Sequence, residues 1–415
     1  MHPFTVLFIA LLAAGLALRE WLLWRQILAV RAGRECVPAP FAASITQEQH
    51  ARAADYTIVL ARAAMAQAAA SAAILLLVTV GGGIAALDTW IAGFGFSAVP
   101  HGVAVIAAIA LALTICGLPF DVWSTFGIEA RFGFNRTTPA LFAVDLLKGL
   151  AISAVLLLPV IAAILWSIPA LGNRWWLWAW GGWALFSFLL SWAWPRLIAP
   201  LFNRFHELED GELRRAVEAL VRRCGFEPRG VRVMDGSRRS THGNAYFTGL
   251  GRAKRIVFFD TLLQSLAPPE VQAVLAHELG HYRLKHVAWR IAWSLAAAFA
   301  GFAALAWLAG QPWFQPALGV AHGGTHTLLL LFVLAAPVFL LPVGPLTAWL
   351  SRRHEFQADD YAARHTNAGV LADALVKLYR DNATTLTPDR LYAAFHASHP
   401  PALARIARLR PQAGQ

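Results

Sequence analysis

Two histidines in the stretch VLAHELGHYRLKH, Val274–His286, are spaced to bind one metal ion. His277 and His281 are four residues apart, so on a helix both imidazoles point the same way. Glu278 follows the first histidine and lies close enough to reach a water molecule on the same ion. Two neutral ligands and a general base on one helix face are the arrangement of a metal-dependent hydrolase. The pattern predicts a hydrolytic zinc site; two surface histidines on an ordinary helix are the alternative.

A catalytic zinc ion takes three protein ligands and a water molecule, so a third ligand must come from elsewhere. The stretch SRRHEFQADDYAARH, residues 351–365, offers Glu355 and Asp359 four residues apart on one helix face. We predict that Glu355 is the third ligand and that Asp359 binds a ligand histidine. A solvated amphipathic helix after a membrane exit is the alternative for this stretch. His286 and His354 fall off both faces and are predicted to be surface residues.

The rest of the chain is too apolar for a soluble enzyme. Of its 415 residues, 58% are hydrophobic and only 14% are charged, against about 25% charged in soluble proteins. The mean hydropathy is +0.52. The formal net charge of +11 comes from basic residues that cluster in loops, which favours contact with membrane lipids over nucleic acid. The three cysteines form no CxxC pair, so any metal must be held by histidine and carboxylate.

Seven stretches are long and apolar enough to cross a membrane, for which about 20 residues are needed. The first begins at the N-terminus, lacks a small-residue cleavage site and is interpreted as a retained span rather than a signal peptide. The seven stretches are residues 3–24, 57–80, 101–120, 147–168, 176–198, 287–309 and 326–350.

Alternate loops between these stretches are basic, which predicts the orientation. Segments 81–100 and 310–325 contain no Lys or Arg, whereas segment 199–286 and the C-terminal tail are strongly basic. Basic loops stay on the cytoplasmic side of a membrane. Apart from Arg174, every loop agrees. The pattern places the N-terminus outside and the C-terminus inside.

The fold class that follows is a polytopic α-helical membrane protein with an α+β metalloprotease part on the cytoplasmic side. Four parts are predicted: spans 1–5 in residues 1–198, the HExxH part in 199–286, spans 6–7 in 287–350 and a C-terminal part in 351–415. In the HExxH part, short strands are expected at GVRVMDG, NAYFTGL and KRIVFFDTLL. A helix is expected over APPEVQAVLAHELGHYRLKH, with proline at its start.

Six motifs in order resemble the zinc-dependent integral-membrane CAAX prenyl endopeptidases, a gluzincin-type family. They are STFGIEARFGFN, IAPLFNRF, NAYFTGLGRAKRIVFFDTLL, VLAHELGHYRLKH, SRRHEFQADDYA and SHPPALARI. The resemblance covers nearly the whole chain. It implies seven membrane helices around a water-filled chamber, capped by the zinc domain. It also gives a role inside that chamber to charged residues near the spans, such as Glu129 and Asp145, for which interfacial positions are the alternative.

The resemblance also implies residue roles. His277, His281 and Glu355 match the family's ligands for one Zn²⁺ ion, and Glu278 matches its catalytic base. Asp359 and His399 match an acidic residue and a histidine of the catalytic machinery; without the resemblance, His399 reads as an ordinary loop residue. The strand segment expected to bind the extended substrate backbone is Asn244, Ala245 and Tyr246.

The predicted activity is zinc metalloendopeptidase activity on a peptide or protein substrate, including lipidated or membrane-associated ones. A membrane-protein quality-control zinc protease is the nearest alternative. A transporter or channel with a vestigial HExxH, or a lipid-binding scaffold, would be the non-enzyme alternatives. A monomer surrounded by membrane lipids is expected, with no nucleic-acid partner. The excess of Arg over Lys and the absence of an organelle-targeting signal favour a bacterial inner membrane.

Overall fold

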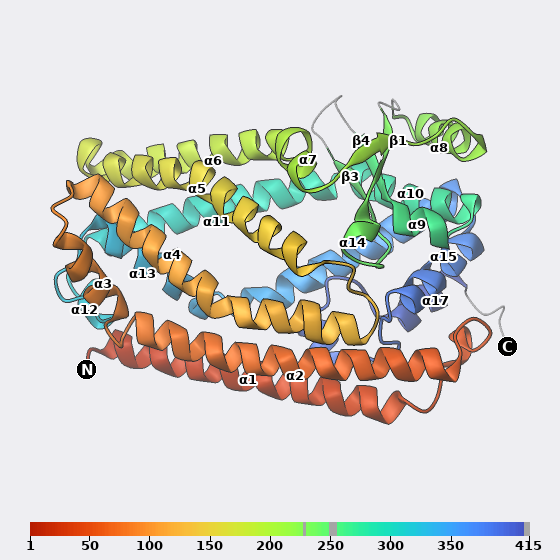
Figure 1. The fold of residues 1–415 in the computed structure, drawn as a ribbon, viewed down its shortest axis with the longest axis horizontal. Coiled ribbons are helices and arrows are strands. Elements are labelled where there is room, and N and C mark those ends of the chain that lie inside the picture. Colours follow the sequence, from red (N-terminus) through yellow and green to blue (C-terminus); the bar gives the residue numbers. More distant parts are fainter. Residues whose placement is uncertain (227–229, 249–254, 411–415) are drawn as a thin grey trace.

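The protein, described here from a computed structural model, is defined for residues 1–226, 230–248 and 255–410. Long helices run side by side along the molecule, and a smaller part that contains a β-sheet lies at one end (Figure 1). The helices of the bundle are α1 (Pro3–Gly33), α2 (Gln47–Val78), α4 (Ala98–Val122), α5 (Pro139–Ala170), α6 (Trp175–Ala193), α11 (His286–Ala309), α13 (Thr325–Phe339) and α14 (Val343–His365). The remaining α-helices are α3 (Gly83–Ala92), α7 (Ala199–Phe202), α8 (Glu212–Arg223), α9 (Asp260–Ser265), α10 (Pro268–Arg283), α12 (Phe314–Ala317), α15 (Ala368–Asp381), α16 (Arg390–His396) and α17 (Ala402–Leu409).

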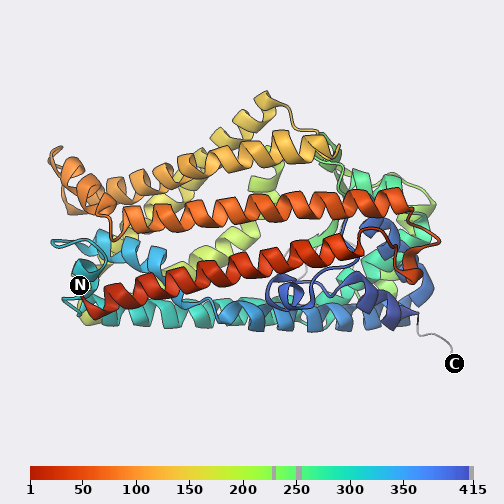
Figure 2. The same ribbon diagram turned by 90° about the horizontal axis from the view of Figure 1, so that it is seen from below.

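Six helices of the described chain are long and apolar enough to cross a membrane, and the number is seven if the bent pair of α13 and α14 counts as one span. The helices of the first two spans, α1 and α2, lie side by side over most of their length (Figure 2). The predicted seventh span, 326–350, is not one straight helix: α13 and α14 meet at an angle of 68°. Pro337 and Pro342 flank the bend, and proline lacks the N–H that would continue the helical hydrogen bonds.

The sheet has four strands, β1 (Phe205–Glu207), β2 (Val231–Met234), β3 (Ala245–Thr248) and β4 (Arg255–Phe259), in the order β1-β2-β4-β3. β4 pairs parallel with β2 and antiparallel with β3, which leaves β3 at an edge. The three predicted strands are present, but residues 249–254, which join two of them, lie outside the described residues. The prediction was wrong after Phe259, where the chain enters α9, and it missed β1.

Helices α10 and α14 pack closely because α10 has a glycine, Gly280, at their contact. A Cβ atom placed on Gly280 would lie 3.1 Å from Ala358 Cα and 3.1 Å from Tyr361 Cβ. Gly280 is the third residue after His277 in the HExxH stretch, so the close contact brings α14 directly against the face that carries the two histidines. The apolar side of α10 also packs with α8, α15 and the sheet in one buried core.

Candidate metal centre

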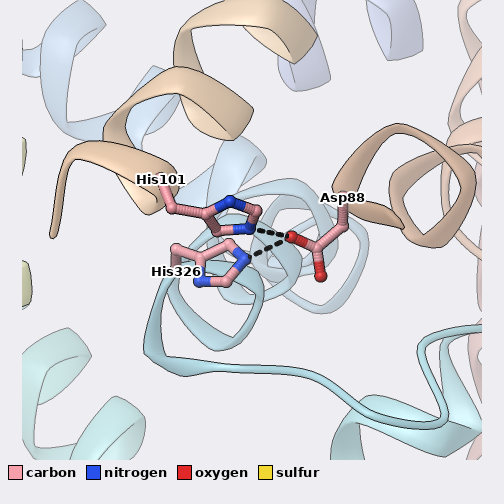
Figure 3. Close-up of side chains that lie close together, drawn as sticks. All are labelled: Asp88, His101 and His326. Atoms are coloured by element: carbon pink, nitrogen blue, oxygen red, sulfur yellow. Dashed lines mark hydrogen bonds and ion pairs between the residues drawn. The ribbon is translucent and has the colours of Figure 1, made fainter. Parts of the chain in front are cut away.

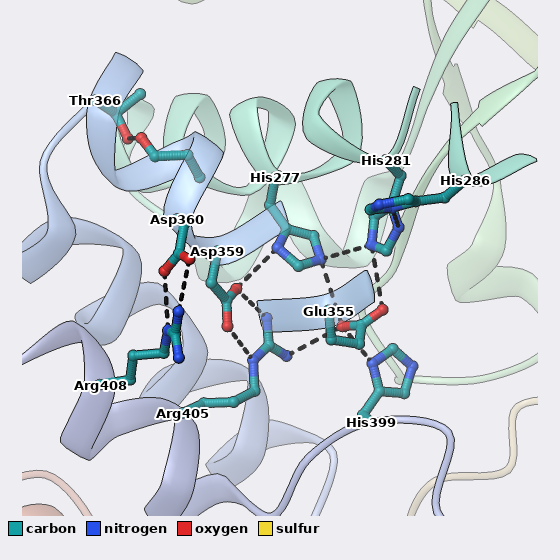
Figure 4. A network of polar contacts seen from close by, with 11 residues as sticks. His277, His281, His286, Glu355, Asp359, Asp360, Thr366, His399, Arg405 and Arg408 are labelled. Carbon is teal, nitrogen blue, oxygen red and sulfur yellow. Dashed lines mark hydrogen bonds and ion pairs between the residues drawn. The ribbon is translucent and has the colours of Figure 1, made fainter. Parts of the chain in front are cut away.

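Three side chains from α10 and α14 converge at one point (Figure 4). The donor atoms of His277, His281 and Glu355 all lie within 4.8 Å of one another. The two Nε2 atoms are 3.2 Å apart. The carboxylate of Glu355 places Oε1 3.2 Å from Nε2 of His281 and Oε2 3.5 Å from Nε2 of His277. The two histidines predicted from their spacing and the predicted third residue therefore meet, although 74 positions separate His281 from Glu355.

The donor set fits a zinc ion. Tetrahedral zinc with ligands at 2.0–2.1 Å has donor atoms about 3.3–3.4 Å apart, close to the separations found here. The charge also fits. Burial acts to lower the pKa of His277, but the carboxylates of Asp359 and Glu355 outweigh it and raise the pKa to about 9. The negative surroundings that hold a proton on His277 favour a cation in its place, and metal binding would release that proton.

Asp359 and Arg405 hold the far nitrogen of His277. Nδ1 of His277 lies 2.9 Å from Oδ1 of Asp359. The same carboxylate accepts two hydrogen bonds from Arg405, 2.8 Å from Nε and 2.6 Å from Nη2. Asp359 is fully buried and Arg405 nearly so. Burial acts to lower the pKa of Arg405, but its hydrogen bonds to Asp359 outweigh this and raise the pKa. These contacts, from Arg405 through Asp359 to His277, keep Nε2 of His277 directed toward the centre.

His286 does the same for His281, which corrects the prediction that it lies on the surface. Its side chain is buried, with Nδ1 3.1 Å from Nδ1 of His281 and Nε2 2.9 Å from Oε1 of Gln357. The reason is a local turn between α10 and α11, in which Lys285 adopts a left-handed conformation with φ 60°. His286 is the first residue of α11, and the turn places its side chain against His281. His354 stacks on His286 with ring centroids 4.0 Å apart.

Glu278, the predicted base, and His399, which the resemblance places in the catalytic machinery, both lie at this centre. The charged or chargeable groups that act on Glu278 are His277, His281, Glu355 and His399. Burial raises the pKa of Glu278, which is the direction a general base near neutral pH needs. Nδ1 of His399 lies 2.7 Å from Oε2 of Glu355, and its ring is about two-thirds exposed.

The predicted substrate segment lies at the edge of the sheet formed by the described residues, where β3 packs against α10. Ala245 is buried, whereas the side chain of Asn244 is exposed and accepts a hydrogen bond from the Ala245 N–H at 2.8 Å. A surface cavity of about 560 Å³ opens beside Asn244 and is also lined by Tyr56 and Asn382. The unpaired edge of a strand is a place where an extended peptide can add hydrogen bonds.

Two charged residues near the spans contact the sheet part of the protein. Asp145 on α5 accepts two hydrogen bonds from Arg239, at 2.8 and 3.1 Å. Glu129 accepts a hydrogen bond from the Tyr56 hydroxyl and lies 3.5 Å from His242 Nε2. These contacts tie the helices to the segment just before β3.

Sequence reasoning missed Arg405 although SHPPALARI contains it. One signal was present: Arg405 shares the buried face of α17 with Ala402, Ile406 and Leu409. A charged residue in an apolar helical stripe requires a buried partner. No comparable signal marked His286, because its burial depends on the turn at Lys285.

Replacing Arg405 with methionine should destabilise the protein by about 3–5 kcal/mol, because it leaves the buried Asp359 carboxylate without its partner. Arg408→Met is the matched control: Arg408 lies on the same helix and binds the neighbouring Asp360, but its side chain is half exposed. Its loss should cost about 1 kcal/mol or less. The measurement is the thermal transition of the tryptophan fluorescence. Equal shifts in the two variants would contradict a special role for the Arg405–Asp359 pair.

Comparisons with known proteins agree over almost the whole chain. Residues 26–204 match the family description "CAAX prenyl protease N-terminal, five membrane helices", and residues 207–413 match "Peptidase family M48". The chain is 35% identical to "CAAX prenyl protease 1 homolog" of Arabidopsis thaliana, over 74% of the chain and 72% of that protein. It is 33% identical to the homologue of Homo sapiens, over 74% and 72%. A crystal structure of S. mikatae Ste24p superposes with a TM-score of 0.90 at 27% identity and covers 99% of both chains.

Proposed function

The chain belongs to peptidase family M48 together with the CAAX prenyl protease 1 homologues, and we propose that its metal centre cleaves peptide bonds near the carboxyl end of membrane-anchored substrates. It is a multi-pass membrane zinc metalloendopeptidase. The observation that carries the substrate proposal is the convergence of His277, His281 and Glu355 beside β3, the edge strand of the described sheet. An extended peptide on that edge and a hydrolytic centre on the adjoining helix α10 are the two parts that such cleavage needs.

In this proposal His277, His281 and Glu355 hold one Zn²⁺ ion, and Asp359 and His286 keep the two imidazoles aimed at it. When bound, the ion supplies Lewis acidity and lowers the pKa of a water molecule to about 7. Glu278 takes a proton from the attacking water and passes it to the leaving amine nitrogen.

His399 and the strand β3 position the substrate in the same proposal. The backbone of Asn244, Ala245 and Tyr246 binds the extended peptide as an added strand. His399 donates a hydrogen bond to the carbonyl oxygen as negative charge develops there, a contribution of about 3–4 kcal/mol for one donor. Nδ1 of its ring lies 2.7 Å from Oε2 of Glu355, and the rest of the side chain is mostly exposed.

The test uses the purified full chain and two quenched fluorescent peptides that end in a CAAX sequence, one farnesylated and one not. We expect cleavage of the farnesylated peptide that stops with 1,10-phenanthroline and returns when Zn²⁺ is added. Faster cleavage of the farnesylated peptide would support an anchored substrate. Cleavage that survives the chelator would contradict the metal mechanism, and cleavage only of an unfolded membrane protein would favour a quality-control protease.

The same proposal includes the membrane arrangement. The metal centre faces the cytoplasm, because the basic loops lie on its side of the spans, and the membrane is the inner membrane of a bacterium. The chain divides at residues 198, 286 and 350 into spans and catalytic parts. A water-filled interior between the spans would admit water and the substrate carboxyl end. The names of the curated relatives do not favour the quality-control alternative.

A further inference from the structure

A second group of metal-binding side chains lies at the other end of the helix bundle. Asp88 on α3, His101 on α4 and His326 on α13 point toward one another (Figure 3). Their donor atoms lie within 4.8 Å of one another. Nε2 of His101 is 2.6 Å and Nε2 of His326 is 2.8 Å from the same oxygen, Oδ1 of Asp88. Helices α3 and α12 mark this end in Figure 1, opposite to α10 and α15.

The two imidazoles of this second group are arranged like the pair on α10. The rings of His101 and His326 have centroids 5.0 Å apart and an angle of 82° between their planes. For His277 and His281 the same quantities are 4.8 Å and 76°. Both pairs present Nε2 to a carboxylate. A tetrahedral ion needs donor atoms about 3.3 Å apart, so the Asp88 oxygen and the two nitrogens would separate by roughly half an ångström on binding.

The backbone around the second group is closely fitted. A Cβ atom on Gly102 would lie 2.6 Å from Cβ of His326 and 2.8 Å from Leu165, so α4 and α13 approach one another directly beside His101. Thr327, the residue after His326, is fully buried, and its hydroxyl lies 2.6 Å from Oε1 of Gln315. The close packing of α4 against α13 therefore places the two histidines side by side, whatever rotamers their side chains adopt.

Among the residues that the structure describes, no lysine or arginine pairs with Asp88. Its ion-pair partners among the described residues are the two histidines, and segments 81–100 and 310–325 contain no Lys or Arg. The Asp88 side chain is only 16% exposed. A largely buried carboxylate requires hydrogen-bond partners and compensating charge. A divalent cation bound by all three side chains would supply it.

We propose that Asp88, His101 and His326 form a second metal site, which binds a divalent transition-metal ion such as Zn²⁺ in addition to the catalytic one. Two imidazoles and one carboxylate are ligands that zinc accepts, with a water molecule in the fourth position. The ion joins α3, α4 and α13, which meet at this end of the bundle. Because the site is far from α10 and uses none of its residues, it stands or falls independently of the peptidase proposal.

The test is a count of Zn²⁺ bound by the full chain after stripping with a chelator, titrated against a competing chromogenic chelator. We expect about two ions per chain for the unaltered protein, and about one for the double variant H277A/H281A. Adding Asp88→Asn to that double variant should remove the remaining ion. Asp88→Asn alone should keep one ion and the peptidase activity.

Asp88→Asn separates a metal site from a purely hydrogen-bonded cluster, since the amide oxygen still accepts a hydrogen bond from a histidine but carries no charge. His326→Gln provides a second variant that removes a nitrogen ligand. One ion in the unaltered protein and none in H277A/H281A would overturn the proposal, whether or not the other variants fold. Binding of Zn²⁺ should also raise the thermal transition of H277A/H281A; an unchanged transition would count against the site.

Discussion

Glu278→Gln is expected to retain zinc and to lose peptide cleavage by about 10²–10⁴-fold, the usual contribution of a positioned general base. Glutamine keeps the size of the side chain but cannot take a proton from the attacking water. Glu278 lies between the two histidines in sequence and is not among the three convergent donors, so the metal should remain. The measurements are kcat for the quenched peptide and zinc content of the same preparation.

Glu270→Gln is the matched control for that substitution. Glu270 lies on the same helix, where its carboxylate accepts hydrogen bonds from the Ala267 N–H at 2.7 Å and from Lys377 Nζ at 2.8 Å. Its replacement should lower stability and leave kcat unchanged. Full cleavage by Glu278→Gln would remove Glu278 from the mechanism. Loss of zinc together with activity would instead make Glu278 a ligand.

Glu355→Gln is expected to weaken zinc binding by more than about 100-fold, because losing only an outer hydrogen-bond partner of a ligand already costs 10–100-fold. Glu355 is the single carboxylate among the three donors, so the change removes the only negative charge in direct contact with the ion. Cleavage should fall with the zinc content and recover in part at high Zn²⁺ concentration. The measurement is a zinc titration followed by metal analysis and peptide cleavage.

Asp360→Asn provides the control for Glu355→Gln. Asp360 lies on the same helix, and its carboxylate pairs with Arg408 near the surface. The control removes one negative charge from α14 but none of the three candidate zinc ligands, so zinc binding should be unchanged. Stoichiometric zinc at ordinary concentrations in Glu355→Gln would show that the third ligand is another residue. One remaining candidate would then be His399, whose Nδ1 lies 2.7 Å from the Glu355 carboxylate.

The sequence by itself determined the parts of the site that lie within one helix. His277 and His281, and likewise Glu355 and Asp359, are four residues apart, and helical periodicity alone puts each pair on one face. The apolar stretches gave the approximate spans, since about 20 apolar residues fit a bilayer whatever their neighbours are. The order of the six motifs gave the family, which the comparisons show.

Only the tertiary structure decided how those pieces meet. The contact of α10 with α14 depends on Gly280 lying against Ala358, and Arg405 reaches Asp359 from a third helix. The second group of metal-binding side chains joins Asp88 to His326 across 238 positions, and no sequence motif indicated that contact. Helical periodicity relates residues that are only a few positions apart, so it can be recognised within a single segment of the sequence. Contact between segments depends on side-chain volume and on bends such as that between α13 and α14, which local spacing does not encode.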